Sequence, residues 1–140
     1  MKFVNFLLLF TFLLVTSCSN KPEPNLELFS PEAFAFDVGD YWEVNAEVYA
    51  KGFDYKESGD TVISKLVYWI DLVSPKGDTL KSIFDDSIEE YSNKVIPEMS
   101  LEAQLEIDTS YVKGNYKFIF NVKDDISKQK KSITAKFELE

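Results

Sequence analysis

The chain has 140 residues, with 15 basic residues, 24 acidic residues and a formal net charge of −9, and this length allows one domain with short flanking segments. The acidic balance makes nucleic acid and anionic lipid headgroups unfavourable partners, because both repel a negatively charged protein. The chain has no histidine and its one cysteine is Cys18, which removes the commonest general base and excludes an internal disulfide or a zinc-thiolate site.

The first residues combine a short basic start at Lys2 with an apolar run from Phe3 to Val15, which only Asn5 and Thr11 interrupt. This pattern is typical of a secretory signal peptide. The run is too short for a transmembrane helix, which needs about 20 apolar residues to cross roughly 30 Å of hydrocarbon. We therefore expect residues 1–17 to be removed from the mature protein.

The apolar run ends in Val15-Thr16-Ser17-Cys18, which resembles the lipobox of bacterial lipoproteins. The resemblance implies that the Cys18 thiol receives a diacylglyceryl group, that a signal peptidase cuts after Ser17, and that the new amino terminus is acylated. Two or three acyl chains hold a protein on a membrane, whereas a single chain binds reversibly. We expect a lipid anchor at Cys18, in the bacterial cell envelope; the alternative is an ordinary secreted protein with an incidental thiol.

Residues 18–26 are interpreted as a lipidated tether, because Cys18 to Asn25 contains two prolines and no apolar periodicity. Fully extended, this stretch spans at most about 29 Å, so the domain would stay close to the lipid surface. Ser19 stands where many lipoproteins retained in the inner membrane have aspartate. The resemblance therefore favours the outer membrane and leaves open the side on which the domain faces.

Residues 27–140 alternate apolar and polar side chains in steps of two, which is the period of half-buried strands. Between Tyr41 and Ala50, for example, Trp42 and Val44 face one way while Glu43 faces the other. The spacing predicts about seven strands without alternating helices, hence an all-β, antiparallel β-sandwich. The expected strands are Glu32 to Asp37, Tyr41 to Ala50, Thr61 to Val73, Thr79 to Phe84, Met99 to Asp108, Tyr116 to Val122 and Ile133 to Leu139.

Three segments have a helical alternative. Met99 to Asp108 contains good helix formers, although the strict alternation of Leu101 to Ile107 with Glu102 to Asp108 favours a strand. Ser30-Pro31-Glu32 and Asp86 to Tyr91 each fit a single helical turn. None of these segments is long enough to form a separate layer.

The end of the chain has Leu105-Glu106-Ile107, then Gly114 to Val122, a polar loop from Lys123 to Lys131 and a last strand. This order resembles the closing strands of immunoglobulin-like and fibronectin type III-like modules, so an immunoglobulin-like sandwich is implied. The resemblance makes Tyr116 the structural tyrosine corner, with Tyr111 as the rival position. The paired cysteines of antibody domains are absent, and the likeness supports a fold more than a function.

We expect no catalytic residue, metal or cofactor. Ser127 and Lys130 match the S-x-x-K spacing, but a polar hairpin loop would not desolvate the lysine and lower its pKa. A D-x-D-x-D-G calcium loop and a glycine-rich phosphate loop are both missing. The remaining alternatives are a calcium site or a small hydrolase that uses paired acids, which we interpret instead as solvated turn residues: Asp85-Asp86, Glu89-Glu90 and Asp124-Asp125.

One strand carries apolar side chains on its outward face, where charged neighbours would be the norm. On Thr61 to Val73 these are Ile63, Val67 and Trp69, and Ile119 extends the patch if the neighbouring strand is the one expected. An exposed apolar stripe of this kind is typical of a docking surface for another protein.

We therefore expect a non-catalytic module that binds a partner, most simply another envelope protein. Tyr55 is a further candidate contact residue near the patch. The alternative is a carbohydrate-binding or adhesion module in which Trp69, Tyr55 or Tyr41 stacks on sugar rings. A third interpretation is that the loop Gly52 to Asp60 folds over the patch and buries it.

Overall fold

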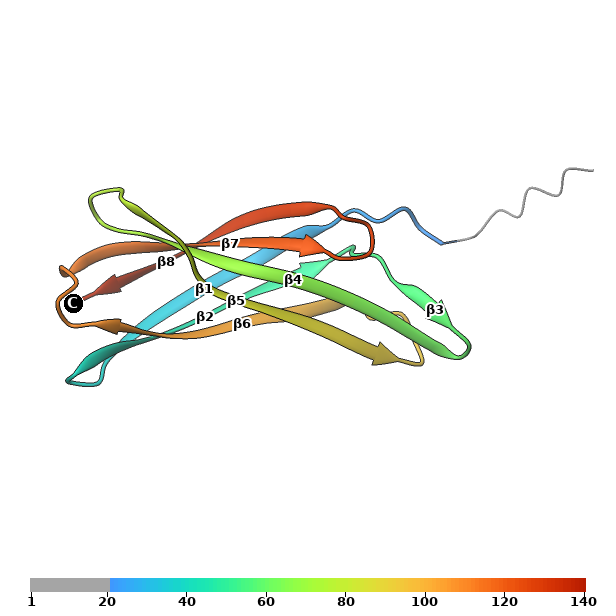
Figure 1. The fold of residues 1–140 in the computed structure, drawn as a ribbon, viewed down its shortest axis with the longest axis horizontal. Helices are drawn as coiled ribbons and strands as arrows, with labels where there is room; N and C mark the ends of the chain where they lie inside the picture. The colour runs from blue at the N-terminus through green and yellow to red at the C-terminus, as the bar shows by residue number, and fades with distance from the viewer. Residues whose placement is uncertain (1–20) are drawn as a thin grey trace, which may run out of the picture.

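A computed structural model describes residues 21–140, which form a β-sandwich of eight strands (Figure 1). The expected signal peptide and Cys18 lie outside the described residues. Within the described range, no helix is long and apolar enough to cross a membrane. The strands are β1 Glu27–Asp37, β2 Tyr41–Lys51, β3 Lys56–Ser58, β4 Thr61–Val73, β5 Thr79–Ser92, β6 Glu98–Asp108, β7 Gly114–Asp124 and β8 Lys130–Leu139.

The strands divide into two antiparallel sheets. The three-stranded sheet has the order β1-β2-β6; in the five-stranded sheet β4 pairs with β3, β5 and β7, and β8 lies beyond β7. Tyr68 on β4 links the sheets, because its hydroxyl donates a hydrogen bond of 2.5 Å to the carbonyl oxygen of Glu102 on β6. Figure 1 shows an elongated sandwich in which the amino-terminal segment and the C-terminus lie at opposite ends.

The core lies between the two sheets and is built mainly from alternate residues of β2, β4, β6, β7 and β8. Phe118 on β7 and Phe137 on β8 have ring centres 4.6 Å apart, and burial of each such side chain contributes about 2–3 kcal/mol. The strict alternation therefore determines which face of each strand is buried. Buried residues include Trp42, Val44, Ala46, Val48, Ala50, Leu66, Tyr68, Ile70, Leu72, Leu101, Phe118, Phe120 and Val122.

The predicted β-sandwich is confirmed, and Met99 to Asp108 is a strand. Both helical turns were wrong. Ser30 and Pro31 form a bulge within β1, and Asp86 to Tyr91 lie inside β5, which pairs with β4 as far as Ser92. A continuous ladder to β4 outweighs the weak helical preference of so short a segment. β3 was also missed, because three residues are too few to show a period of two.

The segment before β1 is held against one end of the sandwich. The Lys21 ammonium contacts the Asp54 carboxylate and lies 4.2 Å from the centre of the Tyr55 ring. The backbone N–H of Leu26 donates a hydrogen bond of 2.9 Å to the side chain of Gln129. The end of the domain that carries the β2–β3 loop and the β7–β8 turn is therefore the end joined to the preceding residues.

Gly52 permits a close approach at the same end. Its backbone carbonyl accepts a hydrogen bond of 2.8 Å from the N–H of Asn25, and its φ is +69°. A Cβ at this position would lie 2.1 Å from the carbonyl oxygen of Asn25. Only glycine fits both the left-handed conformation and this contact.

Candidate binding site

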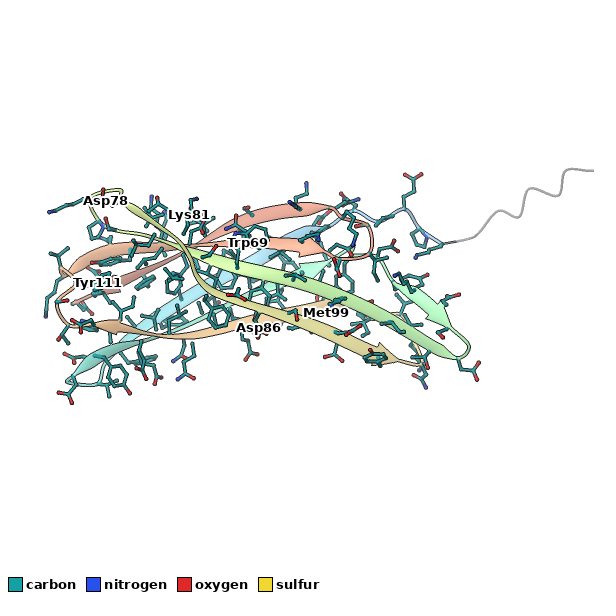
Figure 2. All side chains as sticks on the ribbon, in the orientation of Figure 1. Trp69, Asp78, Lys81, Asp86, Met99 and Tyr111 are labelled. Carbon is teal, nitrogen blue, oxygen red and sulfur yellow. The ribbon has the colours of Figure 1, made fainter. Side chains whose placement is uncertain are left out.

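The predicted apolar patch lies on the outer face of the five-stranded sheet, which we call the Trp69 face. Ile63, Val67 and Trp69 alternate along β4, and Trp69 pairs with Asn121 of β7, next to the pair of Asp71 with Ile119. All four apolar side chains are half-buried. The structure therefore brings the predicted residues together, but surrounds each one with neighbouring side chains. Figure 2 shows Trp69 near Lys81, close to where β5 crosses in front of the sheet.

Asp71 is a buried carboxylate on this face and is 3% exposed. It accepts hydrogen bonds from the Lys81 ammonium at 3.0 Å, from the Ser82 backbone N–H at 2.9 Å and from the Asn121 amide at 3.2 Å. Burial by itself raises the pKa of Asp71, but these hydrogen bonds outweigh it and hold the pKa below its ordinary value. Asp71 thus fastens β5 and β7 to β4.

Other charges on the Trp69 face also have partners. The Lys65 ammonium lies 3.9 Å from the Glu89 carboxylate, and the Lys123 ammonium lies 3.2 Å from that of Asp125. Ion pairs of this kind contribute little to stability. Lysines also stand opposite one another on this face, where Lys117 pairs with Lys136 and Lys123 pairs with Lys130.

The loop Gly52 to Asp60 does not cover Trp69. Phe53 is buried in the core, and β3 extends the edge of the sheet by pairing with β4 at Ile63. Tyr55 is half-buried with its ring below the Lys21 ammonium, and Tyr41 is half-buried on β2, opposite β6. Neither tyrosine stands free as a flat platform.

Tyr116 is buried at the start of β7 and its hydroxyl donates a hydrogen bond of 2.7 Å to the carbonyl oxygen of Val112. This is the contact of a tyrosine corner, in which the hydroxyl bonds back to the backbone a few residues upstream. Burial raises the pKa of Tyr116, and the nearby Tyr111 adds to this effect. Tyr111 is more exposed and lies at the end of the sandwich that carries the C-terminus (Figure 2).

The residues weighed for chemistry have structural contacts. The Ser127 hydroxyl donates a hydrogen bond of 2.5 Å to the carboxylate of Asp124, which is fully buried and also accepts the backbone N–H of Asp54 at 2.7 Å. Lys130 is exposed at the start of β8. Asp124 therefore organises the β7–β8 turn, and Ser127 is one of its donors. Across residues 21–140, no three His, Cys, Asp or Glu side chains are grouped so as to hold a metal ion.

The outer face of the three-stranded sheet holds residues that the sequence analysis missed. Phe34 and Phe36 on β1 are 58% and 54% exposed, more than any residue of the predicted patch. A hollow of about 480 Å³ is lined by residues of all three strands, among them Phe34, Glu47 and Gln104, and by Phe84 of β5 in the other sheet. We call this surface the acidic face; its residues are Glu32, Phe34, Phe36, Glu43, Asn45, Glu47, Glu102, Gln104 and Glu106.

A β-bulge is the reason that Phe34 and Phe36 face outward. The pairing of β1 with β2 shifts by one residue between Phe29 and Glu32, and Ser30 in this bulge has a φ of 49°. Because side chains alternate, a shift of one residue moves every following side chain to the opposite face. Without the bulge, Phe34 and Phe36 would point into the core, where Ala33 now lies.

A signal for this arrangement exists in the sequence. The turn between β1 and β2 is short, and Trp42 on β2 points inward, so Glu43 points outward. Antiparallel pairing across the turn then places Phe36 opposite Glu43, as the structure shows. The alternation Ala33-Phe34-Ala35-Phe36 alone does not reveal which pair is buried, because both alanine and phenylalanine are common in cores.

Glutamates stand directly opposite one another on the acidic face. Glu32 pairs with Glu47, which pairs with Glu102. A second row of glutamates, in which Glu43 is opposite Glu106, lies two outward-facing rows further along the strands. None of these five carboxylates forms an ion pair with a lysine of residues 21–140. Like charges in opposite positions destabilise a sheet, so this pattern lowers the stability of the fold.

The negative potential of this face affects a neighbouring tyrosine. Tyr49 lies on β2 two residues from Glu47, on the same side of the sheet. A hydrogen bond and the charge of Glu47 raise the pKa of Tyr49, and Glu98 and Glu102 add to the effect. Loss of a proton is harder where the surrounding charge is already negative.

Comparisons with known proteins give no family. No protein-family model and no curated protein sequence matches the chain. Among solved structures, the chain is similar to a family 123 glycoside hydrolase from Clostridium perfringens, described in connection with glycolipid glycan hydrolysis, with a TM-score of 0.48 and 12% identity. The match covers 70% of this chain and 21% of that enzyme, so the chain spans about a fifth of its length.

Proposed function

We propose that this protein is a lipid-anchored, non-catalytic binding module of the bacterial cell envelope, attached to a membrane through Cys18. It holds a partner protein close to that membrane. The lipobox-like sequence at Val15 to Cys18 supports the anchor, and the outer membrane is the favoured location. The contact of Lys21 with Asp54 and Tyr55 supports a short connection between anchor and domain.

The observation that carries the binding role is the exposure of Phe34 and Phe36 on the face of a sheet. Exposed aromatic side chains beside one another cost solvation free energy, which a partner recovers by covering them. The groups that would suggest catalysis instead have structural contacts. Asp71 and Asp124 are buried in hydrogen bonds to the backbone, and Ser127 donates to Asp124.

Membrane fractionation of cells that produce Cys18→Ala tests the anchor. We expect this variant in the soluble fraction, while Ser19→Ala, which leaves the lipobox intact, stays with the membranes. Mass spectrometry of the membrane-bound protein should show acyl chains on the residue at position 18. Membrane association of Cys18→Ala equal to that of the unaltered protein would contradict the anchor.

A further inference from the structure

We propose that the acidic face binds an extended, lysine- or arginine-rich segment of a partner protein. The inference rests on the proposed binding role and names the chemistry of the partner, but it does not depend on the lipid anchor. It is drawn from the hollow, from the unpaired glutamates and from the exposed phenylalanines, which lie together on one sheet.

The hollow has the form that an extended segment requires. It lies across β1, β2 and β6 and is also lined by Phe84 of β5. Its polar lining includes Glu32, Glu47 and Glu102, and Phe34 lies among them. Along these strands, successive outward rows are about 7 Å apart, because each residue rises about 3.3 Å and every second side chain points the same way. An extended peptide repeats its side chains at the same spacing. A basic segment therefore presents a cation to each row of glutamates in turn.

The charges of the acidic face determine the sign of the partner. Glu32, Glu47 and Glu102 form one row and Glu43 with Glu106 another, and the face between them contributes no lysine. Hydrogen bonds from Ser100 to Glu47 and from Asn45 to Glu43 offset part of the cost, but glutamates in opposite positions still repel one another. Lysine or arginine side chains of a partner would be attracted to these glutamates and would offset their mutual repulsion. An arrangement that lowers stability but serves binding is typical of a functional surface.

The phenylalanines supply the apolar part of the contact. Phe34 lies in the row between the two rows of glutamates, opposite Asn45. An exposed ring in this position packs against the aliphatic stem of a lysine or below an arginine guanidinium. The bulge at Ser30, which holds a non-glycine residue at a positive φ, is the local strain that turns this ring outward.

Charge complementarity also separates this partner from others. A second copy of the chain carries a net charge of −9 and would bring like charges together on this face. Nucleic acid and anionic lipid are repelled for the same reason. A basic protein segment is attracted from a distance, so association should be fast and sensitive to salt.

A peptide-binding experiment on the full-length protein, purified from membranes in detergent, tests the inference. The probe is a short synthetic peptide that alternates lysine with valine and carries a fluorophore, and its counterpart has glutamate in place of every lysine. Fluorescence anisotropy gives the affinity at about 0.01 and about 0.15 M salt, where the screening length falls from about 30 to about 8 Å. We expect the lysine peptide to bind, more tightly at low salt, and the glutamate peptide not to bind.

Two double variants with the same change in net charge locate the contact. Glu47→Gln with Glu102→Gln neutralises the acidic face, and Glu57→Gln with Glu90→Gln neutralises exposed acids on β3 and β5. We expect the first pair to weaken binding by about tenfold, as a loss of two charge contacts implies, and the second by less than about twofold. Phe34→Ala should also weaken binding, by about fivefold.

Three other results would overturn the inference, and each one points to a different cause. Equal losses from both double variants would mean that the peptide responds to the total charge of the protein. Loss of binding in Trp69→Ala, with the acidic-face variants unaffected, would place the contact on the Trp69 face and preserve the proposed binding role alone. Binding of neither peptide would reject a basic partner, while fractionation of Cys18→Ala would still decide the anchor.

Discussion

On the Trp69 face, Asp71 and Glu89 each lie beside a lysine, and Ile63, Val67, Trp69 and Ile119 are half-buried among neighbours. Tyr91, opposite Ile63 on the edge strand β5, is a large aromatic side chain of this face that is mostly exposed. On the acidic face, Glu47 and Glu102 stand opposite each other without a lysine, and Phe34 is mostly exposed. The same fold therefore presents one outer surface whose central carboxylate, Asp71, is held by a lysine and a backbone N–H, and one whose opposed glutamates form no ion pair with a lysine of residues 21–140. This difference in charge pairing is the reason that we place the proposed partner on the second surface.

The removal of Asp71 should have the largest effect. Asp71→Ala leaves the N–H of Ser82 without its acceptor and removes one of the two acceptors of the Asn121 amide, so we expect a loss of about 2–3 kcal/mol in the free energy of unfolding. Urea denaturation measures it. Glu102→Ala on the acidic face is the matched control and should change stability by less than about 0.5 kcal/mol. A similar loss in both variants would remove the contrast between the two faces.

The contribution of Asp71 should also depend on pH. Because the pKa of Asp71 in the folded protein is below its ordinary value of 3.8, the stabilising effect of Asp71 is present above that value and disappears as the pH falls through the lower, folded-state pKa. The stability difference between the unaltered protein and Asp71→Asn should thus be constant near neutral pH and shrink in acid. A difference that grows in acid would contradict the hydrogen-bonded carboxylate.

Replacement of aromatic residues on the two faces should give unequal effects. Trp69→Ala removes a half-buried ring and should lower the free energy of unfolding by about 1–2 kcal/mol. Phe34→Ala removes a ring that is mostly in water and should change it by less than about 0.5 kcal/mol. Thermal or urea unfolding of both variants makes the comparison. Equal losses would mean that Phe34 is part of the packed structure.

Neutralisation of the opposed glutamates should stabilise the fold slightly. Glu47→Gln relieves repulsion from Glu32 and Glu102, and we expect a gain of about 0.2–1 kcal/mol at low salt. The gain should fall as salt is added, because exposed charges are screened. Urea denaturation at two salt concentrations tests this. A loss of stability would show that Glu47 is held by favourable contacts, of which the hydrogen bond from Ser100 at 2.5 Å is the candidate.

The smallest expected effect concerns Tyr49. Since Glu47 is the main cause of the raised pKa of Tyr49, Glu47→Gln should return this pKa towards its ordinary value of 10.0. Ultraviolet titration, with Tyr49→Phe to assign the transition, measures this change. An unaltered titration would mean that the carboxylates do not set the potential at this position.

The sequence predicted the sandwich because β2, β4 and β7 alternate strictly, and each such strand has only one apolar face to bury. It also placed Trp69 on an outer face, since Leu66, Tyr68 and Ile70 fill the opposite one. The acidic face could not be found from alternation along β1, because the bulge at Ser30 reverses the alternation partway through the strand. The register of β1 after the bulge depends on its pairing with β2, and this pairing cannot be inferred from the periodicity of β1 alone.

The long strand β5 is a second element whose structure could not be predicted from local periodicity. Its acidic residues, such as Asp86 and Glu90, face the side that would be buried elsewhere in the sheet, yet they remain exposed. A strand at the edge of a sheet need not have an apolar face. The sequence of β5 therefore resembles that of a solvated turn. Pairing with β4, rather than composition, determines its structure.

The most direct test is a nuclear magnetic resonance titration of the full-length protein with the lysine–valine peptide, followed through the backbone amide shifts. The contrast between the faces predicts that the largest shift changes occur in β1, β2 and β6 and surround Phe34, Glu47 and Gln104. Changes concentrated around Trp69 and Ile119, or spread evenly over both sheets, would contradict it.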